Sequence, residues 1–170
     1  MIKEVGFGRG HTTFCAAKAF HDAGIQGTIV TIDPVLSQEW LQQLSQVFPR
    51  EWFSYVKFVK DTSQNALPKI EEKFDLVYID GDHSYEGTKF DWENTKDKCQ
   101  QFMLMDDYHL KTKTDSGTIE CRELIDEIDE EKEGFEEKLL IKLDRRLFPD
   151  DRGYTDDQIN YGQILMQRKS

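Results

Sequence analysis

Five short runs of apolar residues punctuate the first two thirds of the chain. They cover residues 2–5, 27–32, 55–60, 74–79 and 102–105 and are rich in β-branched and aromatic side chains. Runs that are apolar at nearly every position are typical of strands buried on both faces of a parallel sheet. The first run leads into a glycine-rich segment, and each of the other four is followed directly by an aspartate. We therefore predict five strands that carry polar groups at their carboxyl ends.

Segments with helical spacing alternate with these runs, at residues 12–23, 37–48, 63–73, from about residue 85, and at 116–130. Gly24 and Pro49 follow the first two segments and are typical of helix ends. This alternation of strands and helices predicts an α/β fold, namely a Rossmann-like open twisted sheet that is mostly parallel and has helices on both faces.

Two late apolar runs, residues 139–143 and 163–166, have no helical segment between them. The stretch between them contains residues 148–153, F-P-D-D-R-G, which are typical of a loop. We therefore expect the two runs to form a C-terminal antiparallel hairpin at the edge of the sheet.

The chain has 170 residues and a formal net charge of −11. The length suits a single domain over residues 1–170, and the excess of acids argues against nucleic acid as a partner, because its phosphates would be repelled. We recognise no membrane-spanning stretch and no signal peptide. Cys15, Cys99 and Cys121 lack C-x-x-C spacing, which is typical of reduced thiols, so we expect a cytoplasmic protein with no membrane partner.

The segment after the first predicted strand reads E-V-G-F-G-R-G, from Glu4 to Gly10. Glycines permit a tight strand-to-helix turn and let a ligand lie against bare backbone. A dinucleotide-binding turn has the spacing G-x-G-x-x-G and holds a pyrophosphate. The present spacing, with a carboxylate in front, suits a ligand with a cationic amino group. It resembles motif I of the class I S-adenosylmethionine-dependent methyltransferases, although a heptad of this kind in isolation would fit a ligand-free glycine turn equally well.

The resemblance implies S-adenosylmethionine as the cofactor, bound beyond the carboxyl ends of the strands. The glycine loop would hold the methionine portion, with His11 and Thr12 near its carboxylate, while Thr12 would serve equally well as a helix cap only. Asp33 would accept the ribose hydroxyls, and Asp61, helped by Ser63, would face the adenine amine. The predicted cofactor-binding residues are Glu4, Gly6, Gly8, Gly10, His11, Thr12, Asp33, Asp61, Ser63 and Asp80.

Two acidic segments follow the fourth and fifth predicted strands, D-G-D-H-S-Y from Asp80 and D-D-Y-H from Asp106. They resemble the metal-dependent small-molecule O-methyltransferases, including the branch related to cephalosporin hydroxylase and to rhamnosyl and macrocin O-methyltransferases. Catechol-type relatives usually have Asn at the position of Asp107. We expect Asp80, Asp106 and Asp107 to bind Mg²⁺, because their hard oxygens suit a hard divalent ion. A solvated acidic edge without a metal is the alternative.

Methyl transfer to an oxygen requires the acceptor, the methyl group and the sulfur to be aligned, and the acceptor to lose a proton. Asp82, His83 and His109 are the candidate catalytic residues. His83 is favoured, because neutral imidazole is a well-matched base near pH 7. We therefore expect methyl transfer from S-adenosylmethionine to a hydroxyl of a small molecule of sugar or natural-product type, assisted by a divalent metal.

Three other functions are compatible with the same residues to different degrees. The glycine spacing disfavours a nucleotide-binding enzyme of another class, and the charge and the lack of an N/D-P-P-Y/F motif disfavour a nucleic-acid methyltransferase. A non-catalytic S-adenosylmethionine-binding or assembly module stays open, because few residues precede Gly6 and the domain would lack most of the family's N-terminal helical lid. Either a partner such as a second copy in a homodimer supplies the lid, or the site is open, or the chain is a fragment.

Overall fold

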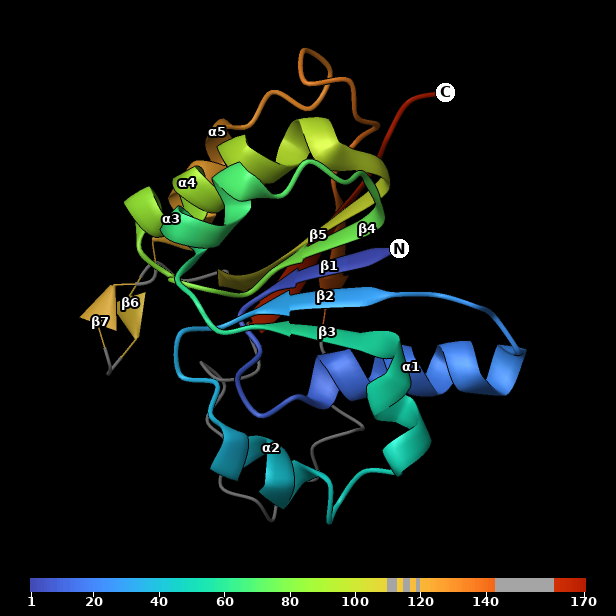
Figure 1. Ribbon diagram of the computed structural model, residues 1–170. Helices are drawn as coiled ribbons and strands as arrows, with labels where there is room; N and C mark the ends of the chain where they lie inside the picture. Colours follow the sequence, from blue (N-terminus) through green and yellow to red (C-terminus); the bar gives the residue numbers. More distant parts are fainter. Residues whose placement is uncertain (110–112, 115–116, 119, 143–160) are drawn as a thin grey trace.

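The computed structural model describes residues 1–109, 113–114, 117–118, 120–142 and 161–170 (Figure 1). Its main strands are β1 Ile2–Val5, β2 Ile29–Ile32, β3 Val56–Val59, β4 Phe74–Ile79, β5 Cys99–His109, β8 Leu139–Lys142 and β9 Tyr161–Gln167. These strands form one seven-stranded sheet with the order β3-β2-β1-β4-β5-β9-β8. Two further short strands, β6 Lys113–Thr114 and β7 Gly117–Thr118, pair with each other.

Strands β1 to β5 are parallel to one another, whereas β9 runs antiparallel between β5 and β8. The mostly parallel sheet and the C-terminal antiparallel hairpin that the sequence predicts are therefore confirmed. The predicted loop at residues 148–153 lies outside the described residues. Among the described residues, no helix combines the length and the apolar character that crossing a membrane would require.

Helices cover both faces of the sheet, as predicted (Figure 1). One face carries α1 His11–Ala23 and α2 Gln38–Leu44, and the other carries α3 Ser63–Ala66, α4 Tyr85–Thr95 and α5 Cys121–Glu127. Three short 3₁₀ helices complete the described elements, η1 Arg50–Tyr55, η2 Leu67–Lys69 and η3 Lys96–Lys98.

Three predicted helices are shorter than their sequence patterns indicate. The segment at 116–130 becomes helical only at Cys121, because Gly117 and Thr118 pair with β6 instead. The segment at 63–73 ends its α-helical part at Ala66 and continues as η2, whose Pro68 has no N–H for an α-helical hydrogen bond. The segment at 37–48 is α-helical only to Leu44.

The strand register brings the predicted polar residues to a single edge. Val5 pairs with Ile32 and with Ile79, and Ile79 pairs with Met105. Since parallel strands in register end at the same edge, the next residue of each strand lies beside the others. These next residues are Gly6, Asp33, Asp80 and Asp106.

Strand β5 is longer than the predicted run at 102–105, because it continues through the two aspartates to His109. Its last part pairs with β9, Tyr108 opposite Gly162 and His109 opposite Tyr161. Asp106 and Asp107 therefore lie within a strand that extends beyond the edge of β4, and not in a loop after its end.

Candidate cofactor and cation site

The glycine loop is shaped by close backbone contacts. Gly6, Gly8 and Gly10 all have positive φ angles, of 91°, 49° and 79°. A Cβ atom at Gly6 would lie 1.9 Å from the carbonyl oxygen of Asp80, so that only glycine fits there. Phe7 anchors the loop from the other side, because its ring is 97% buried and lies 5.6 Å, centroid to centroid, from that of Phe58.

Asp33 holds this loop from the end of β2. One carboxylate oxygen, Oδ2, accepts hydrogen bonds from the backbone nitrogens of Phe7 at 3.1 Å and Gly8 at 3.0 Å, and Oδ1 accepts one from Val35 at 2.8 Å. The carboxylate thus ties the end of β2 to the turn after β1. The sequence singles out Asp33 for the ribose but does not reveal this second task, because nothing local links residues 26 positions apart.

A pocket of about 440 Å³ opens beside the loop, at the carboxyl edge of the sheet. Five of the predicted cofactor-binding residues line it, together with Asp82, which the sequence assigns to catalysis. The five are Gly6, Gly8, Asp33, Ser63 and Asp80. The remaining predicted cofactor residues do not line the pocket. They are Glu4, Gly10, His11, Thr12 and Asp61.

Glu4 lies beneath the glycine loop, in the interior of the protein. Its side chain is 98% buried and accepts hydrogen bonds from the hydroxyls of Thr13 on α1 and Thr31 on β2, the latter at 2.6 Å. Burial raises the pKa of Glu4 to about 7, although the two hydroxyls act in the opposite direction. The carboxyl group therefore connects α1 with β1 and β2, a contact that the sequence does not indicate.

The other predicted cofactor residues outside the pocket lie on the surface or in local turns. His11 and Thr12 begin α1 and are exposed. Asp61 accepts hydrogen bonds from the backbone nitrogen of Thr62 at 2.9 Å and from Asn65 Nδ2 at 3.0 Å. These bonds lower the pKa of Asp61 and engage its Oδ1 atom locally, at the start of α3.

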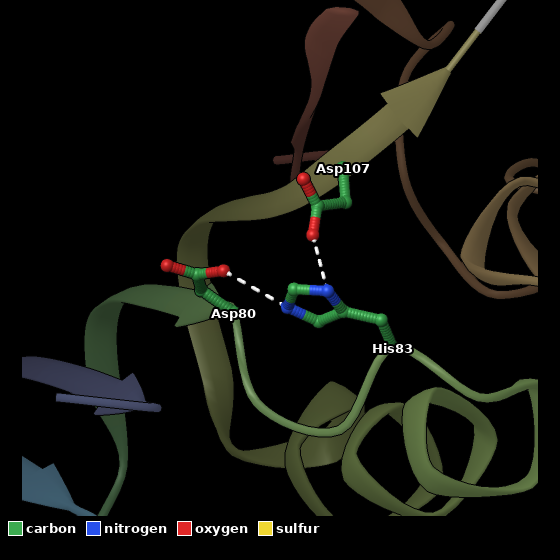
Figure 2. A group of neighbouring side chains, drawn as sticks. All are labelled: Asp80, His83 and Asp107. Atoms are coloured by element: carbon green, nitrogen blue, oxygen red, sulfur yellow. Dashed lines mark ion pairs between the residues drawn. The ribbon is translucent and has the colours of Figure 1, made fainter. Parts of the chain in front are cut away.

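Asp80, Asp106 and Asp107 form an acidic centre, which shares Asp80 with the lining of the pocket. Figure 2 shows His83 between Asp80 and Asp107. The ring of His83 lies between two carboxylates, with Nε2 at 3.5 Å from Asp80 Oδ1 and Nδ1 at 2.5 Å from Asp107 Oδ2. Hydrogen bonds to Asp107 and then to Asp80 raise the pKa of His83 to about 10, so that the ring carries a positive charge at neutral pH. Burial, opposed by the bond to His83, raises the pKa of Asp80.

A backbone irregularity in β5 directs Asp107 toward His83. The pairing of β5 with β9 shifts between Met105 and Tyr108, and Asp107 has a φ angle of 54°. Its backbone nitrogen donates to Asp106 Oδ1 at 2.9 Å. In a regular strand, consecutive side chains would point to opposite faces, and a bulge is a recurrent means of redirecting one of them. The left-handed conformation of Asp107 thus accompanies the contact of its carboxylate with His83.

Tyr78 joins Asp106 to the rest of the acidic centre. Its buried hydroxyl donates to Asp106 Oδ2 and lies 3.3 Å from Asp80 Oδ2. Two of the predicted metal ligands, Asp80 and Asp107, are therefore brought together around His83. The third, Asp106, is connected to Asp80 through the Tyr78 hydroxyl and lies outside this group of potential ligand atoms. The sequence did not single out Tyr78, and its only signal was a position two residues before Asp80 on the same strand face.

The donor atoms of this centre fit a divalent cation. One ligand atom from each of Asp80, His83 and Asp107 lies within 4.8 Å of the others. Carboxylate oxygens suit Mg²⁺ or Mn²⁺, and an imidazole nitrogen extends the choice to transition metals. Asp82 accepts a hydrogen bond from the backbone of Ser84 at 3.0 Å and faces the pocket. His109 is the last residue of β5, and its side chain is outside the described part of the chain.

Comparisons with known proteins agree with this architecture. Residues 4–108 match the family described as a methyltransferase domain, and no curated protein matches the sequence. Cofactor-bound Rv0187 from MTB has a similar structure, with 19% identity, a TM-score of 0.67, and 99% of this chain and 72% of that chain covered.

Two further solved structures have the same fold at low identity. An O-methyltransferase from Bacillus cereus, in complex with SAH, is 17% identical with a TM-score of 0.61, covering 99% of this chain and 73% of that chain. An rRNA methylase from Streptococcus thermophilus is 12% identical with a TM-score of 0.64, and the match covers 99% of this chain and 86% of that chain. From the match over most of its length and from the order of its strands, the chain belongs to the methyltransferase-domain family and has the fold of the class I S-adenosylmethionine-dependent methyltransferases.

Proposed function

We propose that this protein transfers a methyl group from S-adenosylmethionine to a hydroxyl of a small molecule, of sugar or natural-product type, with the help of a divalent cation. The position of Asp80 carries this proposal. Asp80 lines the pocket beside the glycine loop and also belongs to the acidic centre. A nucleoside in the pocket and an acceptor at the acidic centre would therefore be neighbours, as direct group transfer requires.

The pocket supports S-adenosylmethionine as the cofactor. Gly6 and Gly8 expose backbone to it, and Asp33 at the end of β2 and Ser63 at the start of α3 offer polar groups. Three N–H groups occupy the Asp33 carboxylate, which has about four acceptor positions, so that a ribose hydroxyl would take a remaining one or replace Val35. The B. cereus relative contains SAH.

The acidic centre supports an oxygen acceptor. Asp80 and Asp107, which belong to one group of potential ligands, would hold the cation together with Asp106, which follows Met105 on β5. A cation bound there would lower the pKa of the acceptor hydroxyl and help to orient it. The proton of the acceptor would pass to His83, Asp82 or His109. His83 acts as a base only after the proton shared with Asp80 and Asp107 has left, because these two groups keep the ring charged.

A non-catalytic S-adenosylmethionine-binding module is the second candidate. The observation that favours it is the ion pair of His83 with Asp80 and Asp107, which offsets part of the negative charge of the acidic centre from within the chain. Such a module would bind the cofactor in the pocket and transfer nothing. An RNA acceptor, as in the S. thermophilus relative, is less compatible with a net charge of −11.

The test combines cofactor binding with turnover on a panel of sugar and phenolic hydroxyl compounds. We expect calorimetry to show micromolar SAH binding, and methyl transfer that stops when EDTA is added and returns with Mg²⁺. Asp106→Ala should abolish this metal-dependent transfer and leave SAH binding nearly intact, because Asp106 does not line the pocket. Asp97→Ala, an exposed acid in η3 before β5, is the matched control. Transfer that EDTA does not change would exclude the metal, and SAH binding without any transfer would favour the second candidate.

A further inference from the structure

We infer that Tyr78 is a positioning residue for the cation site, because its hydroxyl fixes the facing oxygens of Asp80 and Asp106 in one arrangement. Neither the sequence motifs nor the family match assigns a task to this tyrosine. The inference rests on the proposed function, since it concerns the cation of that same site.

The phenol of Tyr78 lies where two strands bring their carboxylates together. Tyr78 and Asp80 belong to β4 and are two residues apart, so their side chains leave the same face of the sheet. Tyr78 pairs with Leu104 of β5, which is two residues before Asp106. The ring is 97% buried, and its hydroxyl is near Oδ2 of both aspartates, with the separation from Asp80 at 3.3 Å.

The Oδ1 atoms of Asp80 and Asp106 have partners other than Tyr78. Asp106 Oδ1 accepts the backbone N–H of Asp107 at 2.9 Å, and Asp80 Oδ1 faces His83. The Oδ2 atoms of both residues face the Tyr78 hydroxyl. Gln163 on β9 contributes a further bond, because its Nε2 donates to the Tyr78 oxygen at 3.4 Å. The single O–H of the phenol therefore donates to Asp106 Oδ2, the nearer acceptor, with Asp80 Oδ2 at 3.3 Å, while the phenol oxygen accepts from Gln163.

A hydroxyl between two carboxylates affects metal binding more than folding. Two acids that face each other repel, and a donor near both reduces this repulsion and orients the carboxylate of Asp80, which belongs to the group of potential ligands. Groups that orient metal ligands in this way typically change metal affinity by about 10–100-fold when removed. Phenylalanine would keep the buried ring and its packing, and would remove only the donor.

The experiment compares Mn²⁺ binding by the wild-type protein and by Tyr78→Phe, with calorimetry and with the electron paramagnetic resonance signal of the free ion. We expect Tyr78→Phe to weaken Mn²⁺ binding by about 10–100-fold while SAH affinity stays within about twofold. Tyr85→Phe is the matched control, because it also removes a phenol–carboxylate bond, the exposed one to Glu127, which involves none of the three aspartates. It should leave both affinities unchanged.

The outcomes separate this inference from the proposed function. Wild-type Mn²⁺ binding with the same affinity in Tyr78→Phe would overturn the positioning role and leave the metal-dependent function standing. No Mn²⁺ binding by the wild type would overturn both. If Tyr78→Phe does not fold, Gln163→Met takes its place in the test. This variant removes the hydrogen bond that Gln163 donates to the Tyr78 oxygen and leaves both aspartates unchanged. A weaker Mn²⁺ affinity would support the positioning role, and an unchanged affinity would contradict it.

Discussion

The carboxylate of Asp33 lies 3.0 Å from the backbone nitrogen of Gly8, and the same oxygen lies 3.1 Å from that of Phe7. The end of β2 thereby holds the turn that follows β1, and both line one pocket. An acid that is expected to recognise the cofactor also shapes the loop on which the cofactor would lie. Replacing it would therefore affect the binding site in two ways.

We expect Asp33→Ala to weaken SAH binding by roughly 100-fold or more, because each hydrogen bond to a charged group contributes about 1.5–3 kcal/mol. Asp33→Asn keeps one acceptor oxygen and should give an intermediate affinity. Calorimetry with SAH measures both variants, and thermal unfolding shows whether the loop alone is affected. Wild-type affinity in Asp33→Ala would refute the assignment of this residue to the cofactor.

The glycines of the loop should respond differently to the same substitution. An added Cβ at Gly6 would collide with Asp80 O at 1.9 Å, whereas at Gly8 no atom lies within 4 Å. We expect Gly6→Ala to lower the free energy of unfolding by on the order of 2–4 kcal/mol. Gly8→Ala should cost about 1–2 kcal/mol for its left-handed backbone and should mainly weaken SAH binding. Urea unfolding and calorimetry distinguish the two, and equal stability losses would contradict the close approach of Gly6 to the end of β4.

The buried carboxyl of Glu4 makes stability depend on pH. Its pKa is about 7 in the folded protein against an ordinary value of 4.5, so the folded state binds more protons between these limits. Its contribution is complete below pH 4.5 and is lost as the pH rises through 7. Glu4→Gln cannot ionise, so the stability of this variant relative to wild type should increase between pH 5 and 8. Urea unfolding across that range measures the trend, with the exposed Glu71→Gln as control, and a constant difference would show that Glu4 is not perturbed.

Lys3 presents the opposite case on the other face of β1. Within the described part of the chain, its fully buried Nζ has no hydrogen-bond partner, and it lies 5.4 Å from the centre of the Phe74 ring. Burial, with a smaller effect of Lys98, lowers its pKa to about 7. The cost of burying the charge is therefore complete below pH 7 and declines as the pH rises toward the ordinary value of 10.5.

We expect Lys3→Met to be more stable than the wild type, because methionine fills a similar volume without a buried unpaired charge. The melting temperature should rise by several degrees at pH 6 to 7, and the difference should shrink above pH 8. Calorimetric melting at these pH values measures it, and Lys73→Met, at an exposed position, should have little effect. A less stable Lys3→Met would mean that the ammonium group has a stabilising partner.

Much of the framework could be predicted from local patterns. The strand at Ile2–Val5 and that at Phe74–Ile79 have the bounds that the apolar runs indicate. The convergence of Asp33, Asp80 and Asp106 follows from parallel pairing, since register places the residues after each run at one edge. The roles of these acids in cofactor and metal binding are still predictions, as are the identity of the acceptor and the base.

The partners of these side chains could not be predicted in the same way. Glu4 was expected at the ligand, but it bonds to Thr13 and Thr31 inside the protein. The ion pair between His83 and Asp107 depends on the bulge in β5, and the packing against β9 that fixes this bulge is set far along the chain. No local pattern indicates a left-handed aspartate.

The sequence by itself determined the α/β order, the glycine turn and the acids at the strand ends, because these depend on the periodicity and conformational freedom of neighbouring residues. Only the tertiary structure decided which groups meet. Tyr78 reaches Gln163 across 85 positions of the chain, and His83 reaches Asp107 across an irregular strand pair. Contacts of this kind depend on how strands from distant segments are aligned, and a shift of a single residue would turn each side chain to the opposite face.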